Sequence, residues 1–312
     1  MHSIADRLRP VPRHEAAGRR RETPTTDGGV TPTVSRITVY PVKSLDPLDR
    51  ERARVVDGAL ELDREYAVVD APAGADHDPD AASPSGDGDY VNGKRTDAVH
   101  RLRSAFDPDA HTLTLRSPDG ESRTFELDDD REPLNEWLSA YFGRRVSVRR
   151  ADGGHPDHRR SGIGGPSVIS TATLREVASW FDDLDVDSVR RRVRANVEVG
   201  GVPAFWEDRL YADRGETVPF RVGDVEFLGV EPCERCVVPS RDPETGAPDP
   251  EFRERFLRRR RETRPSWLDS DRYDHDYRLM VITRVPEREW GASIAVGDEV
   301  EVLGVRRTDD DR

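Results

Sequence analysis

The chain has 312 residues, of which 62 are acidic and 49 basic, and its formal net charge is −13. This balance argues against nucleic-acid binding, which needs a clustered positive face, and the basic run at residues 258–261 is interpreted as a solvated helix face. No apolar run approaches the roughly 18 to 20 residues that cross a bilayer, and residues 1–33 lack the apolar core of a secretory signal, so we predict a cytoplasmic protein that binds no membrane.

Lysine is nearly absent from the basic residues, because Lys43 and Lys94 are the only two lysines and all the others are arginines. This composition is typical of the hydrated acidic surface that halophiles use for solubility at high salt, and it says little about the fold. Since most surface positions have taken arginine, the lysine at position 43 is a weak pointer to a specific role.

The first half of the chain has a β-type pattern. Residues 1–33 show almost no apolar periodicity, which predicts a disordered leader. Strand patterns begin at "VSRITVYPVKSL" and recur as far as "RVSVRR", interrupted by an acidic low-complexity loop at residues 71–89. The segment "PLNEWLSAYFG" has apolar residues at helical spacing and a glycine stop, which predicts a helix closing a first domain of residues 34–150.

The second half, residues 155–305, opens with a strand that runs into a helix. In "SVISTATLREVASWF", Thr173 and Glu176 fit a capping box. Later segments such as "VPFRVGDVEFLGV" and "SIAVGDEVEVLGV" are strand-like, and residues 306–312 form a tail. The predicted fold class is mainly β with a few helices (α+β), in which an N-terminal β-barrel domain packs on a second β-barrel-like domain.

The stretch "VEPCERCVVPSRDPETG", residues 230–246, contains both cysteines of the chain, Cys233 and Cys236. A thioredoxin-like pair needs a helix N-terminus that lowers the thiol pKa, but here a short strand and a turn are predicted to follow. A structural zinc site needs four ligands, and the candidates, His275 and the histidines of "HPDH", are isolated or poorly patterned. A zinc site completed by histidines is thus less favoured, and two further alternatives stay open: a packing role, and a soft metal held by one thiolate.

Several arginines, one inside this stretch and others earlier in the chain, offer groups that bind anions. Arg235 lies between the two cysteines, and Arg192, Arg194 and Asn196 occur together in "RRRVRANVEV". Guanidinium groups match the geometry of phosphate oxygens. An arginine-rich site with one thiolate therefore suits a metal on a phosphate-bearing organic carrier.

The chain resembles a known family at motifs that occur in the family's order across residues 34–305. "VSRITVYPVKSL" is similar to the opening of the β-barrel domain that precedes MOSC domains, and "NVEVGG", "WED", "FRVGDVEF" and "PCERCVVPSRDPETG" resemble the MOSC domain itself. The family includes the mitochondrial amidoxime reducing component and bacterial relatives that reduce N-hydroxylated compounds. The arginine–cysteine step followed by Asp-Pro-x-Thr-Gly is the most specific part of the resemblance.

The resemblance implies a molybdenum–molybdopterin cofactor, in mononucleotide or dinucleotide form, with Cys236 as metal ligand and catalytic residue. It further implies cofactor contacts from Lys43, Arg64, Ser170, Thr171, Arg194, Asn196 and Arg235. Simpler alternatives are an exposed strand-end charge for Lys43, a solvent ion pair with Asp63 or Glu65 for Arg64, a turn cap for Asn196 and a packing role for Cys233.

The implied function is a molybdenum oxidoreductase that reduces N-hydroxylated or related N-oxygenated small molecules. The alternative is a non-catalytic cofactor carrier or a sulfur-handling protein of cofactor maturation. A pyridoxal phosphate step is not expected, because neither Lys43 nor Lys94 lies in a Schiff-base pattern. No cysteine follows Cys236 to hold an iron–sulfur cluster, so a separate electron-donor protein is expected. The Gly-rich "SGIGGPSVIS" replaces the family's Asp-Thr-Ser-Pro stretch and puts the shared substrate in doubt.

Overall fold

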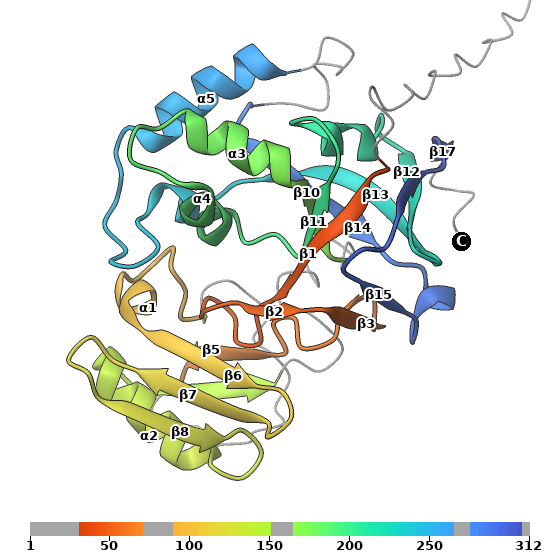
Figure 1. Ribbon diagram of the computed structural model, residues 1–312. Helices are drawn as coiled ribbons and strands as arrows, with labels where there is room; N and C mark the ends of the chain where they lie inside the picture. The colour runs from red at the N-terminus through yellow and green to blue at the C-terminus, as the bar shows by residue number, and fades with distance from the viewer. Residues whose placement is uncertain (1–30, 72–89, 151–164, 265–274, 308–312) are drawn as a thin grey trace, which may run out of the picture.

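The computed structural model describes residues 31–71, 90–150, 165–264 and 275–307. Most of the predicted leader and tail, the acidic loop and the histidines of "HPDH" lie outside the described residues. The described chain forms two lobes (Figure 1). We call the sheets and helices of residues 66–150 the small lobe, and the remaining sheets and helices the large lobe.

The small lobe consists of two antiparallel pieces of sheet packed against one helix. One piece contains β6 (Arg103–Asp107), β7 (Thr112–Arg116) and β8 (Ser122–Glu126), and the other pairs β5 (Tyr66–Asp70) with β9 (Val146–Arg150). Helix α1 (Ala98–Arg101) precedes β6. Helix α2 (Arg131–Phe142) follows β8 and ends at Gly143, whose φ of 64° is a left-handed conformation that glycine adopts readily. The helix predicted near residue 133 is confirmed.

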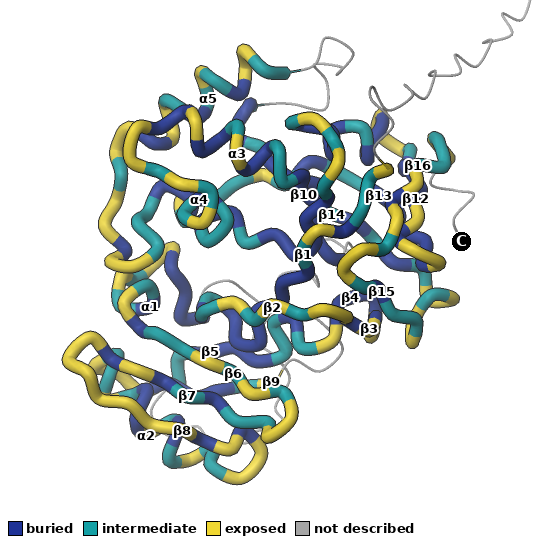
Figure 2. Tube along the Cα trace, in the orientation of Figure 1, coloured by how far each residue is buried: buried dark blue, intermediate teal, exposed yellow. Residues whose placement is uncertain are grey.

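The large lobe is built on a nine-stranded sheet with the order β16-β12-β13-β14-β10-β11-β1-β2, to which β17 adds by pairing with β12. Its strands are β1 (Thr33–Val39), β2 (Leu48–Arg50), β10 (Ser167–Ser170), β11 (Val197–Gly200), β12 (Glu216–Val222), β13 (Val225–Glu234), β14 (Arg278–Arg284), β16 (Val300–Val302) and β17 (Arg306–Arg307). A small sheet contains β15 (Ser293–Ala295), β3 (Arg52–Val56) and β4 (Ala59–Leu60). Figure 2 shows that buried residues concentrate along β1, β10 and β14.

Helices of the large lobe connect its strands. The longer ones are α3 (Thr171–Ser179), α4 (Val186–Val193) and α5 (Phe252–Thr263), and the short 3-10 helices are η2 (Trp206–Leu210), η3 (Val238–Ser240) and η5 (Glu287–Glu289). Helices α3 and α4 form the crossover between β10 and β11, which is a parallel pair, as such a connection requires. No helix in the described part of the chain is long and apolar enough to cross a membrane.

The first strands of the chain belong to the large lobe. β1 pairs with β11, with Val34 opposite Val199, and β3 pairs with β15. Sheet membership therefore changes between β4 and β5 as well as between β9 and β10, and the division into domains at residues 150–160 stays a prediction. The sequence pattern predicts a strand here, but a strand pattern does not identify the partner strand.

The predicted fold class, mainly β with a few helices (α+β), is confirmed. Two local predictions are wrong. Ser170, and not Thr173, caps α3, because its hydroxyl accepts a hydrogen bond from the Thr173 backbone N–H at 3.0 Å. After Cys236 the chain forms the 3-10 helix η3 instead of a short strand, and Pro239 lies near its start, where proline is well tolerated.

Candidate functional site

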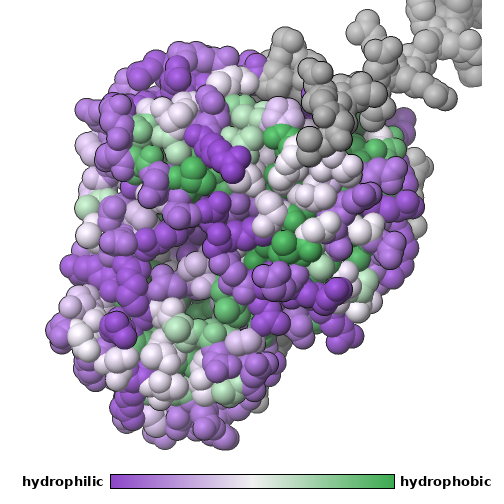
Figure 3. All heavy atoms as spheres, in the orientation of Figure 1, coloured by the Kyte–Doolittle hydropathy of each residue, from purple (hydrophilic) through white to green (hydrophobic). Residues whose placement is uncertain are grey.

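A cavity of about 360 Å³ lies between the two lobes. Figure 3 shows that the face toward the viewer is hollowed between the lobes and that hydrophilic side chains border the hollow. The small lobe contributes the turn at Asn92 and residues of α1. The large lobe contributes the loop after β1, the end of α4 and the ends of β13 and β14. Segments far apart in the sequence therefore build one site.

The lining of this cavity is basic although the chain as a whole is acidic. Nine of the 49 basic residues line it, namely Lys43, Arg64, Lys94, Arg103, Arg191, Arg192, Arg194, Arg235 and Arg241. The carboxylates in the lining are Asp46 and Glu234. Because the low-dielectric walls of a cleft strengthen such a field, the cavity favours an anionic ligand.

Four of the lining guanidinium groups are held by main-chain carbonyl oxygens. Arg192, Arg194, Arg235 and Arg241 donate to such oxygens at 2.5 to 3.0 Å. Within the described ranges none of the four forms an ion pair with a carboxylate. The Nε atoms of Arg235 and Arg241 are also buried without a hydrogen-bond partner there. Buried donors without partners are costly, but one also occurs away from the cavity, at Arg149, so they are not specific to this site.

Arg194 follows α4 in the left-handed conformation, with a φ of 56°. Its guanidinium carbon lies 3.9 Å from the centroid of the Tyr40 ring, and the corresponding carbon of Arg64 lies 4.8 Å from the same centroid. Burial lowers the pKa of Arg194 to about 10, and the nearby charge of Arg64 acts in the same direction. Arg194 therefore remains a cation at neutral pH.

Backbone strain is concentrated at the cavity. Eight non-glycine residues in the described ranges have positive φ, and four of them line the cavity: Ser44 (72°), Arg64 (55°), Arg194 (56°) and Met280 (64°). Each such conformation costs of order 1 kcal/mol or more and persists only where the surrounding structure imposes it. Because strain of this kind gathers at ligand sites, its distribution is independent support for a functional site here.

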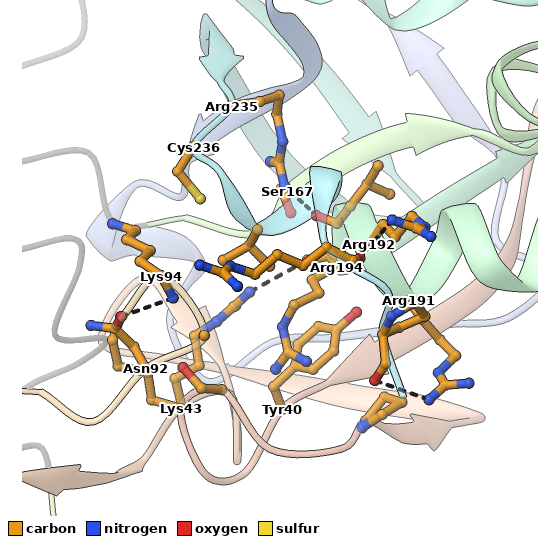
Figure 4. A pocket seen from close by; sticks show the side chains of 18 of the residues that line it. Tyr40, Lys43, Asn92, Lys94, Ser167, Arg191, Arg192, Arg194, Arg235 and Cys236 are labelled. Atoms are coloured by element: carbon orange, nitrogen blue, oxygen red, sulfur yellow. Dashed lines mark hydrogen bonds between the residues drawn. The ribbon is translucent and has the colours of Figure 1, made fainter. Parts of the chain in front are cut away.

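Both cysteines line the cavity, but their surroundings differ. Cys233 lies on β13, where its sulfur accepts a hydrogen bond from Arg235 Nη1 at 3.3 Å and packs beside the aromatic core under α3 and α5. Cys236 lies in the loop between β13 and η3, is half-buried and points into the cavity (Figure 4). No cluster of three metal-ligating side chains occurs in the described part of the chain. The cysteine pair is therefore asymmetric.

The turn "DPETG" after the cysteines joins the two lobes beside the cavity. Asp242 accepts two backbone N–H bonds, at 2.8 and 3.1 Å, and Gly246 has a φ of 74°. A Cβ atom at Gly246 would lie 2.7 Å from the Cβ of Asp97 in the small lobe, so the contact requires glycine. Arg103 of the small lobe donates to the Glu244 carbonyl at 3.1 Å. The turn thus holds one wall of the cavity in place.

Six of the eight predicted site residues line the cavity, namely Lys43, Arg64, Arg194, Asn196, Arg235 and Cys236. Lys43 is 8% exposed, and its ammonium nitrogen lies 5.4 Å from the centroid of the Tyr90 ring, so the alternative of an exposed strand-end charge is wrong. Arg64 does pair with Asp63, but both side chains are largely buried and not in solvent.

Asn196 lines the cavity, but its amide holds the sheet together. It is 2% exposed, its Oδ1 accepts from the Ser167 backbone N–H at 3.1 Å, and its Nδ2 donates to the Thr38 carbonyl at 3.1 Å. These bonds join β10 to β1. The alternative of a turn cap is wrong, and the cofactor contact stays a prediction.

Ser170 and Thr171 do not line the cavity, and we remove them from the candidate site. Ser170 is fully buried as the cap of α3, and its backbone N–H donates to the Glu207 carboxylate at 3.2 Å. The Thr171 hydroxyl bonds to the Ser35 hydroxyl at 2.9 Å. A hydroxyl residue before a helix is foremost a capping signal, and Ser170 acts as a cap here.

Several lining residues were missed by the sequence analysis, among them Lys94, His100, Arg103, Arg191 and Arg241. Arginines that line a cavity carry no distinguishing signal in a chain this rich in arginine. Lys94 does carry one, because it is the second of only two lysines, and both line the same cavity.

Comparison with known proteins identifies the domains. The family described as MOSC N-terminal beta barrel domain matches residues 31–184, and the MOSC domain family matches residues 163–301. The chain therefore combines a MOSC N-terminal domain with a MOSC domain. The two matches overlap at residues 163–184, which contain β10 and α3.

This MOSC protein is similar to longer proteins as well. It is 23% identical to a molybdenum cofactor sulfurase from Caenorhabditis elegans and 25% identical to one from Caenorhabditis briggsae, over 70% of the chain in each case. The chain spans 30% of the length of these relatives. A crystal structure of the YUAD protein from Bacillus subtilis matches with a TM-score of 0.40 and 15% identity, covering 87% of this chain and 95% of that one.

Proposed function

We propose that this MOSC protein binds a molybdenum–pterin cofactor in the cavity between its lobes and reduces N-hydroxylated or related N-oxygenated small molecules. One observation carries the proposal: the half-buried thiol of Cys236 shares a cavity with guanidinium groups that are held by main-chain carbonyls and not by carboxylates. The printed names of the curated relatives, which refer to the molybdenum cofactor, support the same class of ligand.

The residues of the cavity fit such a cofactor. A thiolate is a suitable ligand for a soft or high-valent redox metal, and Cys236 points into the cavity. Arg235 and Arg241 line the cavity, and guanidinium groups match the geometry of phosphate oxygens. Lys43, in the loop after β1, and Arg194, at the end of α4, would add positive charge.

The reaction converts R–NH–OH to R–NH₂ by breaking the N–O bond, and it consumes two electrons and two protons and releases water. The cofactor, when bound, supplies the two-electron chemistry. Arg235 positions the loop that carries Cys236, because it donates to the Val193 carbonyl at 2.9 Å. Glu234 also lines the cavity, and its carboxylate lies 2.8 Å from His275 Nε2. A separate redox protein would deliver the electrons.

The test is metal and cofactor analysis of protein purified from a molybdenum-replete host. We expect about one molybdenum and one pterin per chain, since a thiolate and phosphate-binding arginines act together. Such protein should reduce benzamidoxime to benzamidine with reduced methyl viologen as electron donor. Protein that takes up neither molybdenum nor pterin, even when incubated with isolated cofactor, would contradict the proposal.

A second candidate is a non-catalytic carrier of the cofactor, or a protein that handles sulfur during cofactor maturation. The names of the two sulfurases favour it, although this chain matches only 30% of their length. Pyridoxal phosphate belongs to neither candidate, because no Schiff-base lysine pattern occurs in the sequence. Stoichiometric cofactor without reduction of benzamidoxime, and transfer of that cofactor to an apoenzyme, would favour the carrier.

A further inference from the structure

We propose that Lys94 is a substrate-specificity residue whose ammonium group binds an anionic oxygen group of the substrate, a carboxylate or a phosphate, at the exposed side of the cavity. The inference rests on the proposed reductase function of the same site. It narrows the substrate class from N-oxygenated compounds in general to anionic ones.

The distribution of lysine in the chain points to this residue. The chain has 49 basic residues, only two of which are lysines, and both lysines are among the nine basic residues that line the cavity. They differ in exposure, because Lys43 is 8% exposed whereas the side chain of Lys94 is exposed to solvent. Of the two lysines that line the cavity, Lys94 is therefore the one that is open to solvent.

The turn that carries Lys94 is rigidly built. The Oδ1 of Asn92, a residue only 5% exposed, accepts from the Lys94 backbone N–H at 3.1 Å, and its Nδ2 donates to the Tyr90 carbonyl at 3.2 Å. The carbonyl of Gly93 lies 3.2 Å from His100 Nε2, and a Cβ at Gly93 would lie 2.5 Å from that atom. A lysine on a pre-organised turn loses less entropy on binding than one on a loose loop.

Lys94 is placed on the side of the cavity where the chemistry is proposed. Figure 4 shows that the side chain of Lys94 extends toward the part of the cavity that contains Cys236. Arg194 and Arg64 lie around Tyr40 and are part-buried, so they suit a group that stays bound. An ammonium group has rotatable donors and no fixed fork, which suits a solute that exchanges in each catalytic cycle.

The experiment compares two substrates of the same shape and different charge. Benzamidoxime is neutral, and 4-carboxybenzamidoxime adds one carboxylate. For Lys94→Met we expect kcat/KM to fall about ten-fold or more for the carboxylated substrate, mainly through KM, and to stay within about two-fold for the neutral one. Added salt should erode the wild-type preference for the anion.

Two further variants serve as controls. Lys94→Arg keeps the charge and should restore most of the preference. Arg95→Met removes one positive charge from the adjacent exposed residue, which does not line the cavity. It should leave kcat/KM unchanged for both substrates. Calorimetric binding of 4-carboxybenzamidoxime to the oxidised holoprotein gives a readout without turnover, and it should weaken in Lys94→Met alone.

The outcomes separate this inference from the function beneath it. Wild-type protein that binds no molybdenum and does not reduce benzamidoxime overturns the proposed function and the inference with it. Active wild-type protein in which Lys94→Met affects both substrates equally, or neither, overturns the inference alone. Loss of molybdenum from Lys94→Met would make this residue a cofactor ligand and would also overturn the inference.

Discussion

Arg260 is fully buried and Arg194 is part-buried, and their charges are used differently. Arg260 of α5 is 0% exposed, and its Nη2 donates to both carboxylate oxygens of Asp208 at 2.6 and 2.7 Å. Arg194 donates to the Leu45 carbonyl at 2.8 Å and pairs with no carboxylate in the described ranges. The first charge is neutralised inside the fold, whereas the second is held at the cavity.

The comparison shows what separates a structural charge cluster from a candidate site. Glu207, the neighbour of Asp208 in the chain, accepts hydrogen bonds from Ser170 and Thr173. The buried cluster of Glu207, Asp208 and Arg260 therefore also explains why Ser170 is not part of the cavity. A charge held by neutral carbonyls keeps its field for a ligand, whereas a charge paired with a carboxylate does not. Changes to the cluster should therefore affect folding, and changes to the cavity should affect binding.

The largest expected effect is that of Asp208→Ala, which leaves Arg260 buried without its carboxylate. We expect the free energy of unfolding to fall by about 3 to 5 kcal/mol, because breaking a buried pair strands the other charge. Guanidinium chloride denaturation measures this. Arg258→Ala, on the exposed side of the same helix, should change it by less than about 0.5 kcal/mol. A loss below about 1 kcal/mol for Asp208→Ala would contradict the assigned pairing.

The next effect is a dependence of stability on pH that originates at Glu207. Burial raises the pKa of this carboxyl to about 7 from an ordinary value of 4.5, and the charge of Asp208 acts in the same direction. The hydrogen bond from Thr173 and the charge of Arg260 lower the pKa, but they do not outweigh burial. The folded state therefore binds a proton more tightly than the unfolded one, so stability falls as pH rises from about 4.5 to 7 and then stays constant.

Glu207→Gln should abolish this contribution, which is on the order of 3 kcal/mol over the whole window. Chemical denaturation of both proteins at several pH values between about 5.5 and 8 gives the slope of the free energy of unfolding against pH. A slope that is the same in both would show that Glu207 is ionised in the folded protein over that range.

Arg194→Met should show the reverse behaviour of Asp208→Ala. We expect cofactor affinity to fall at least about ten-fold, because a charge-assisted hydrogen bond is lost, while stability of the cofactor-free protein falls by only about 1 kcal/mol. Methionine at this position inherits the same positive φ, so backbone strain is matched. If Arg194→Met lost as much stability as Asp208→Ala and bound cofactor normally, the distinction between the two arginines would fail.

The smallest effect is expected for Glu244→Gln at the "DPETG" turn. Its carboxylate pairs with Arg191 at 3.0 Å, but the side chain of Glu244 is 65% exposed, so the ion pair is worth about 0.5 kcal/mol or less. The main-chain bond from Arg103 to the Glu244 carbonyl is retained in the variant. A loss above about 1 kcal/mol in thermal or chemical unfolding would show that the turn depends on this exposed pair.

The sequence predicted the fold class because strand and helix patterns are local signals. The roles of the candidate site residues and the asymmetry of the cysteines followed only from the family resemblance, above all from the step at Arg235 and Cys236 and the turn that follows. The partner of β1 could not be predicted, since a strand pattern does not identify the neighbouring strand. Ser170 and Thr171 were misplaced because a hydroxyl before a helix looks the same whether it caps the helix or faces a ligand.

Other features of the cavity depend on long-range folding. The positive φ of Ser44 and Met280 is imposed by surrounding structure, and neither residue is a type that favours it. Lys94 reaches the cavity from the small lobe, and only its rarity marked it in the sequence. Helix and strand patterns describe segments, whereas a cavity is defined by the way segments meet.

The molybdenum content of Cys236→Ser, purified in parallel with Cys233→Ser from a molybdenum-replete host, tests the central claim most directly. The account predicts that Cys236→Ser loses most of its molybdenum, by about ten-fold or more, because a thiolate ligand is replaced by a poor one. Cys233→Ser should keep nearly all of it, since its sulfur accepts from Arg235 and packs beside the core. Full molybdenum content in Cys236→Ser would contradict the account.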